Sequence, residues 1–181
     1  MGTINFEVAA LCILLLNFFL FFSRSRLYLQ QTRVFLILLL STTFATVADI
    51  ITVVMYWNVY RYSTGLLYAA NILYYIFQNS VPLVFFIFLL ALSGKTGAKR
   101  RFAIFLTAFP WMASLSLILT TPVTGWVFSF DTDYGYHRGA VLPLLYAIAF
   151  GYTLTGLGVF VRNRMRVSRE TRIAIFLFLP F

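Results

Sequence analysis

The sequence predicts an all-α protein built as a bundle of transmembrane helices, and three observations predict this class. Of the 181 residues, 61% are hydrophobic and only 10% are charged, whereas a soluble domain carries about 25% charged residues. The apolar residues form long continuous runs, as spanning helices require, and lack the alternation of a membrane β-barrel. The basic residues gather between these runs. Together these features exclude a water-soluble domain.

The apolar runs, taken in order, predict five complete helices and the start of a sixth. We expect the complete helices at Ile4–Phe22, Val34–Trp57, Leu66–Leu92, Phe102–Thr120 and Ala140–Val161. A sixth apolar run covers Ile173 to Phe181, and nine residues rise only about 14 Å in a helix. We therefore expect the single domain, residues 1–181, to be cut short within its sixth helix.

The distribution of basic residues predicts the orientation of the helices. Twelve of the fourteen Lys and Arg residues lie in three clusters, at residues 24–33, 95–101 and 162–172. Lysine and arginine concentrate in the cytoplasmic loops of membrane proteins. We therefore expect a multi-pass protein of the cell membrane with an extracytoplasmic N-terminus. The lipid bilayer is the expected partner, and the net charge of +9 then reflects basic loops on its cytoplasmic side. No nucleic-acid partner is expected.

Polar residues inside the predicted helices are candidates for a ligand-sensing site, because ionisable groups at membrane depth are costly. Asp49 precedes Trp57 by eight residues, which places it about 12 Å below the outer end of its helix. The third helix offers three amide side chains as partners for Asp49, and Asn71 and Gln78 share a helix face. The candidates inside the helices are Glu7, Asp49, Asn71, Gln78 and Asn79.

Two interpretations of these polar residues remain open. They form either an interhelical hydrogen-bond network that holds the bundle together, or the lining of a pocket that senses a small ligand or a proton from outside. The longest outer loop, Thr121–Gly139, adds three candidates: Asp131, the sole histidine His137, and Arg138. Histidine titrates near neutral pH and is suited to sensing, while a solvated loop with local ion pairs is the alternative.

The sequence offers no constellation for catalysis or metal binding. One histidine and a few aspartates provide few metal ligands, and the single cysteine, Cys12, excludes an intramolecular disulfide. No zinc-binding helix, nucleophile elbow or phosphate-binding glycine loop is present. We therefore expect no catalytic residue, no metal and no cofactor within this chain.

Several stretches resemble the N-terminal multi-span sensor region of Gram-positive bacterial signalling proteins, the group called the histidine kinase N-terminal 7TM region. These stretches are Thr46–Ile50, Asn79–Pro82, Thr121–Phe128, Phe130–Asp131 and Tyr136–Gly139. The resemblance extends over essentially all 181 residues. Similar regions also precede GGDEF diguanylate cyclase domains.

The resemblance implies a sensory input module that responds to an unknown small extracellular ligand or physical stimulus. It implies regulation of a C-terminal GGDEF diguanylate cyclase, which the loop motifs favour, or of a histidine kinase. It also implies a homodimer formed through that output region, although this chain departs from the family by having no output domain. The alternative is a small free-standing transporter or carrier, for which inverted repeats and broken helices would be expected.

Overall fold

The structure is a computed structural model that describes residues 5–23, 30–92, 98–131 and 135–162. The predicted start of the sixth helix, Ile173–Phe181, lies outside the described residues, as do Asp133 and many residues of the basic clusters. The predictions for these segments therefore stay predictions.

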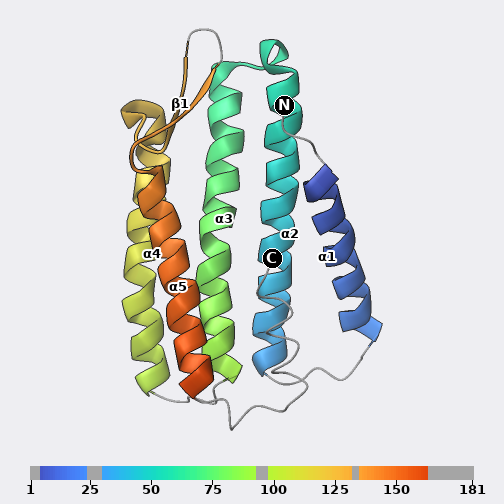
Figure 1. The fold of residues 1–181 in the computed structure, drawn as a ribbon, viewed down its shortest axis with the longest axis vertical. Coiled ribbons are helices and arrows are strands. Elements are labelled where there is room, and N and C mark those ends of the chain that lie inside the picture. Colours follow the sequence, from blue (N-terminus) through green and yellow to red (C-terminus); the bar gives the residue numbers. More distant parts are fainter. Residues whose placement is uncertain (1–4, 24–29, 93–97, 132–134, 163–181) are drawn as a thin grey trace.

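In the described part of the chain, five long helices run up and down as an antiparallel bundle (Figure 1). They are α1 (Asn5–Ser23), α2 (Gln30–Trp57), α3 (Thr64–Leu92), α4 (Ala98–Thr124) and α5 (Leu142–Arg162). All five are long and apolar enough to cross a membrane. The predicted all-α class with five helices is therefore confirmed, and the five helices indicate a multi-span membrane protein.

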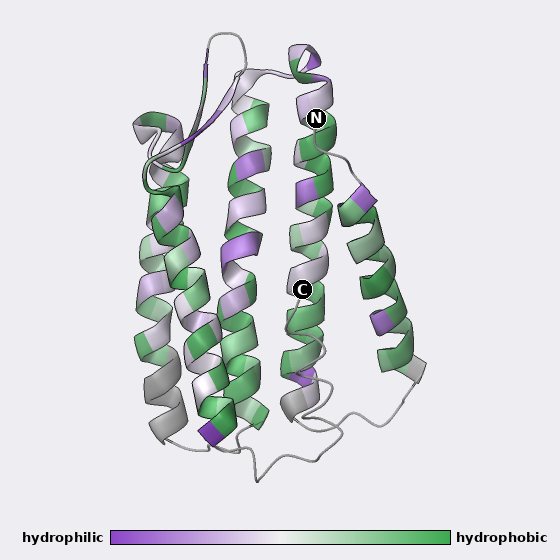
Figure 2. Ribbon diagram, viewed as in Figure 1, coloured by the Kyte–Doolittle hydropathy of each residue, from purple (hydrophilic) through white to green (hydrophobic). Residues whose placement is uncertain are grey.

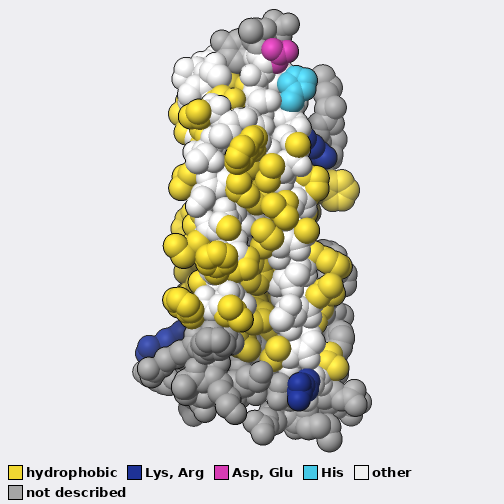
Figure 3. Space-filling view, turned by 90° about the vertical axis from the view of Figure 1, so that its left-hand side faces the viewer, with side chains coloured by type: hydrophobic (Ala, Val, Ile, Leu, Met, Phe, Trp, Pro, Cys, Tyr) yellow, Lys and Arg dark blue, Asp and Glu magenta, His cyan; other side chains and the backbone are white. Residues whose placement is uncertain are grey.

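The two ends of the bundle differ in character. One end, which we call the hairpin end, carries the short 3₁₀ helix η1 (Val59–Arg61) and strands β1 (Phe128–Phe130) and β2 (Tyr136–Arg138). The opposite end, which we call the basic end, carries Arg33 and Arg162 near the ends of α2 and α5. Between the ends, hydrophobic side chains cover the face shown in Figure 3, and the charged side chains lie toward the two ends.

Helix α3 lies at the centre of the packing, because it contacts α2, α4 and α5. Its buried residues contribute to three hydrophobic clusters. Tyr75 belongs to the cluster nearer the hairpin end, and Phe86 and Leu89 belong to two clusters that share the half of α3 nearer the basic end. Helix α1 packs principally against α2 at the edge of the bundle. A displacement of α3 would therefore be felt by most of the molecule, whereas α1 is able to move with less disturbance.

The described residues of the segment predicted as an outer loop, Thr121–Gly139, form defined structure. Its first residues extend α4 to Thr124, and Gly125 then ends the helix with φ 64° and an N–H that donates to Thr121 O at 2.8 Å, the left-handed cap that glycine favours. The following residues form an antiparallel hairpin in which Phe128 opposes Arg138. Gly139 follows β2, and its N–H donates to Val127 O at 2.8 Å. Only glycine fits at this position, because a Cβ atom there would lie 2.1 Å from Trp126 O.

The contact between α3 and α5 predicts a difference between two glycines of α5. A Cβ atom at Gly156 would lie 2.9 Å from Leu89 Cδ1, whereas one at Gly158 meets nothing within 4 Å. Gly156→Val should lower the free energy of unfolding by about 1–3 kcal/mol through overpacking. Gly158→Val is the matched control and should leave it nearly unchanged. Thermal unfolding in detergent measures both, and equal stability of the two variants would contradict this packing.

Candidate functional site

Within the bundle, α2 carries a hydrophilic band toward the hairpin end, and α3 carries such bands toward that end and near its middle, all among hydrophobic neighbours (Figure 2). The ionisable residues that interact with one another at this end come from five elements. We call them the acid–tyrosine cluster: Glu7 of α1, Asp49 of α2, Tyr74 and Tyr75 of α3, Tyr136 of β2 and Tyr146 of α5. This cluster is the candidate functional site.

The two carboxylates of the cluster, Glu7 and Asp49, come from the two helices of the α1–α2 contact and lie within electrostatic range of each other. Asp49 is half-buried. At the other end of the same contact, the rings of Phe21 and Phe35 have centroids 5.6 Å apart. Phe21 follows Glu7 by fourteen residues and Phe35 precedes Asp49 by fourteen, which is close to four helical turns. Both pairs therefore belong to one antiparallel register.

Tyr74 connects the carboxylates to the tyrosines of the hairpin end. It interacts electrostatically with Asp49 and Glu7 on one side, and with Tyr146 and Tyr136 on the other. Its neighbour Tyr75 is buried, and its hydroxyl lies 2.6 Å from the hydroxyl of Tyr136 in a direct hydrogen bond. Electrostatic interactions thus extend from α1 to α3, and a direct hydrogen bond joins α3 to the hairpin.

Tyr136 is held in an apolar stack against α3. Phe128, which is fully buried, stacks on Tyr75 and on Tyr136 with ring centroids 5.5 Å and 5.9 Å away. Burial raises the pKa of the Tyr136 phenol above its ordinary value of 10.0. The phenol is therefore neutral at physiological pH and able to hydrogen-bond, and its stabilising contribution is lost only as the pH rises above about 10.

The three amide candidates of α3 occupy different environments. The Nδ2 groups of Asn71 and Asn79 donate to the carbonyls of Leu67 and Tyr75, four residues earlier in their own helix. Asn79 is buried, with 7% of its surface exposed, Asn71 is half-buried, and Gln78 is exposed. The structure therefore brings Glu7 and a tyrosine to Asp49, and gives the asparagine amides partners within α3.

The three candidates of the loop lie on or beside the hairpin, and all three are exposed. His137 and Arg138 belong to β2, where His137 opposes Ser129. Arg138 lies two residues from Tyr136 on β2, within electrostatic range of the Tyr136 phenol at the edge of the acid–tyrosine cluster. The backbone N–H of Asp131 donates to Gly135 O at 3.0 Å across the hairpin turn. Within the described part of the chain, no group of three or more His, Cys, Asp or Glu is placed to hold a metal ion.

Sequence reasoning missed the tyrosines, although one signal for them was present. Tyr68 and Tyr75 are seven residues apart, a spacing that places them on one helix face. Both rings stack on Phe128, and the Tyr68 hydroxyl accepts a hydrogen bond from the Phe130 N–H at 3.3 Å. Their hydrogen-bond partners lie some sixty residues away in the sequence. The local pattern therefore predicts that the two tyrosines share a helix face, but it does not predict that the hairpin packs on that face.

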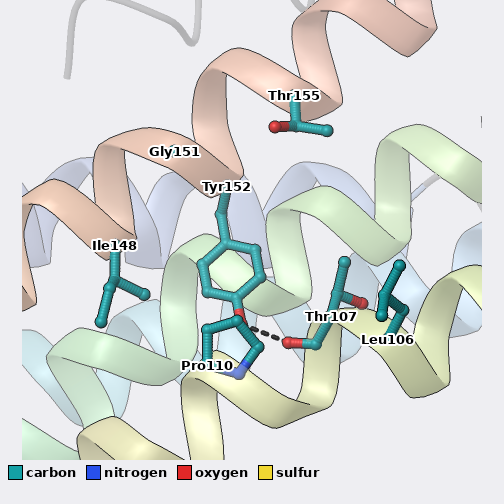
Figure 4. A pocket seen from close by; sticks show the side chains of 7 residues that line it. All are labelled: Leu106, Thr107, Pro110, Ile148, Gly151, Tyr152 and Thr155. Carbon is teal, nitrogen blue, oxygen red and sulfur yellow. Dashed lines mark hydrogen bonds between the residues drawn. The ribbon is translucent and has the colours of Figure 1, made fainter.

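A second feature is a groove between α4 and α5, halfway along the bundle. Its volume is about 360 Å³, and it is lined by Leu106, Thr107, Pro110, Ile148, Gly151, Tyr152 and Thr155. Figure 4 shows the Tyr152 hydroxyl donating across it to the carbonyl of Thr107. The lining is apolar apart from hydroxyl groups, so the groove offers no acid–base pair for catalysis.

Comparison of the chain with known protein families, with curated proteins and with solved structures gives no match. These comparisons identify no family, and the resemblance to the sensor region of bacterial signalling proteins rests on the motifs quoted above.

The hydrogen bond between Tyr75 and Tyr136 predicts energetic coupling between the hairpin and α3. Tyr75→Phe and Tyr136→Phe should each lower the free energy of unfolding by about 1 kcal/mol, as expected for one lost hydrogen bond. The double variant should be scarcely less stable than either single variant, because the bond is lost only once. Chemical unfolding in detergent measures the stability of the wild type and the three variants, which together form a double-mutant cycle. Strictly additive losses of stability would show that the two hydroxyls are not partners.

Proposed function

We propose that this chain is the membrane-embedded sensory input module of a bacterial signal-transduction protein. It regulates a C-terminal GGDEF diguanylate cyclase domain, or a histidine kinase domain, and the output regions pair in a homodimer. The observation that carries the proposal is the acid–tyrosine cluster. Ionisable side chains are costly in hydrocarbon and mark functional positions, and here Glu7, Asp49 and Tyr74 come within electrostatic range of one another from three helices.

The packing of α3 supports transmission of a signal along the bundle. At the hairpin end α3 supplies Tyr74 and Tyr75 to the cluster, and toward the basic end it packs against Phe160 of α5 through Leu89 and Leu92. A stimulus shifts a conformational equilibrium only if it binds two packings with different affinity. In this proposal the stimulus changes the cluster, and the shift of α3 and α5 reaches the cytoplasmic side.

The proposed orientation places the hairpin end outside the cell and the basic end in the cytoplasm. This orientation follows from the preference of Lys and Arg for cytoplasmic loops and agrees with the positions of Arg33 and Arg162 at the same end of the bundle. The cluster then lies in the extracytoplasmic half of the membrane.

Substituted-cysteine labelling tests this orientation in a Cys12→Ser background, in which no other cysteine is present. Ser63→Cys, beside η1, should react with a membrane-impermeant maleimide in intact cells. Arg162→Cys, at the end of α5, should react only after the membrane is permeabilised. Labelling of Arg162→Cys in intact cells, with protection of Ser63→Cys, would show that the orientation is the opposite of the proposed one.

The signalling proposal predicts a specific effect of Asp49. Expressed from the complete reading frame, the wild-type protein should form cyclic di-GMP, or autophosphorylate, in response to a change at the extracytoplasmic face. Asp49→Ala should abolish at least about four-fifths of that response, since a coupling of 1–3 kcal/mol corresponds to about 5–150-fold. Thr43→Ala is the control, because the Thr43 hydroxyl only bonds to Leu39 O within α2.

Membrane levels of each variant are compared by immunoblot, so that a loss of response is not a loss of protein. Equal responses of Asp49→Ala and wild type at equal membrane levels would refute the assignment of Asp49. A reading frame without an output domain, together with solute flux in proteoliposomes, would instead support the transporter alternative.

A further inference from the structure

Helix α1 meets the rest of the protein along a single stripe. Half-buried positions recur at Glu7, Leu14 and Phe21, seven residues apart. The other faces are open and carry large apolar side chains such as Phe6 and Phe19, which are 82% and 68% exposed. The stripe packs against α2, so the strength of this one contact decides whether α1 stays with the bundle.

The polar end of this stripe is a pair of like charges. Glu7 is the charged residue of α1, and the antiparallel register set by the Phe21–Phe35 contact places it at the level of Asp49 on α2, within reach of its charge. The Oε2 atom of Glu7 exposes almost no surface and has no hydrogen-bond partner. Within the described residues, neither carboxylate has a Lys or Arg partner, and the remaining titratable groups around the pair are Tyr74 from α3 and, beyond it, Tyr136 and Tyr146.

The depth of the pair makes two negative charges unfavourable. Helix α2 has 28 residues, a length of about 42 Å, whereas the hydrocarbon layer is about 30 Å thick. The end of α2 at Trp57 therefore lies at headgroup level, and Asp49 lies about 6 Å inside the hydrocarbon. Two adjacent carboxylates at that depth are both dehydrated and repel each other, unless a cation neutralises one of them.

We propose that Glu7 and Asp49 bind one proton between them, and that this proton holds α1 against α2. The carboxylic acid O–H of one side chain donates to a carboxylate oxygen of the other, which also satisfies Glu7 Oε2. The proton comes from water at the hairpin end and returns to it. Its loss leaves two like charges that separate α1 from α2. The inference rests on the proposed function in one respect, since it names the proton as the stimulus.

Infrared difference spectroscopy of the protein in nanodiscs tests whether the proton is bound. At about pH 7 exposed carboxyls are ionised, so a carboxylic acid C=O band that shifts in D₂O reports a protonated pair. The band should be present in wild type and in Asp131→Asn, whose substituted side chain lies on the exposed hairpin. It should be absent from the double variant Glu7→Gln/Asp49→Asn. A wild type without the band, or a double variant that keeps it, overturns the inference.

Distance measurements by electron paramagnetic resonance test whether the proton holds α1. Cys12 of α1 is the sole cysteine of the chain, so Ser63→Cys completes a pair of spin-labelling sites between α1 and the hairpin end. Between about pH 5 and about pH 9, the population at the docked distance should fall several-fold in the otherwise wild-type chain. In Glu7→Gln, in Asp49→Asn and in the double variant, which cannot carry two negative charges at the pair, it should stay docked throughout. A distance distribution independent of pH in the wild-type pair refutes the switch.

The two proposals fail separately. If the proton is bound and α1 responds to pH while the output enzyme does not, the sensory function is wrong and the proton site stands. If Asp49→Ala abolishes the response of the output enzyme while the infrared band is missing from wild type, the proton site is wrong and the sensory function stands.

Discussion

The structure depends on the rule that polar groups carried into hydrocarbon must find partners inside the protein. Most of the hydroxyl and amide side chains in these helices satisfy it locally. The hydroxyls of Thr42, Thr43 and Thr46, for example, donate to carbonyls four residues earlier in α2, a common pattern for Ser and Thr in helices. Groups that bond within their own helix place little constraint on how the helices pack. The arrangement is therefore fixed by the few groups that reach across.

Among the described residues, hydrogen bonds of this kind tie α4 and the hairpin to α3. The Trp111 Nε1–H of α4 donates to the Ser80 hydroxyl at 3.2 Å, and Tyr75 and Tyr68 bond to the hairpin. The aromatic stack around Phe128 adds apolar area to the last two, since aromatic pairs contribute beyond their burial. The hairpin is thus an integral part of the bundle, and a perturbation at the hairpin end acts directly on the central helix.

Much of the fold, but less of the site, could be predicted from the sequence. Continuous apolar runs of sufficient length identify each spanning helix, and Pro82 and Pro110 did not interrupt α3 and α4. The hairpin could not be predicted, because it is built on contacts between Tyr75 and Tyr136, sixty-one residues apart. Asp49 was identified by its depth alone. Its association with Glu7 depends on the register of α1 against α2, which hydropathy does not encode, since apolar faces slide past one another at little cost.

The choice of two acids at this register has a consequence for how tightly α1 is held. An arginine in place of Glu7 would form a permanent ion pair with Asp49, and α1 would be fixed at every physiological pH. An apolar residue there would leave Asp49 unpaired in hydrocarbon, which is costly. Two carboxyls make the attraction conditional, because it exists only while a proton is shared and becomes repulsion once the proton leaves. A helix with one packed face and a conditional polar contact meets the requirement for a switch, which is two packings that differ in their affinity for a single ligand.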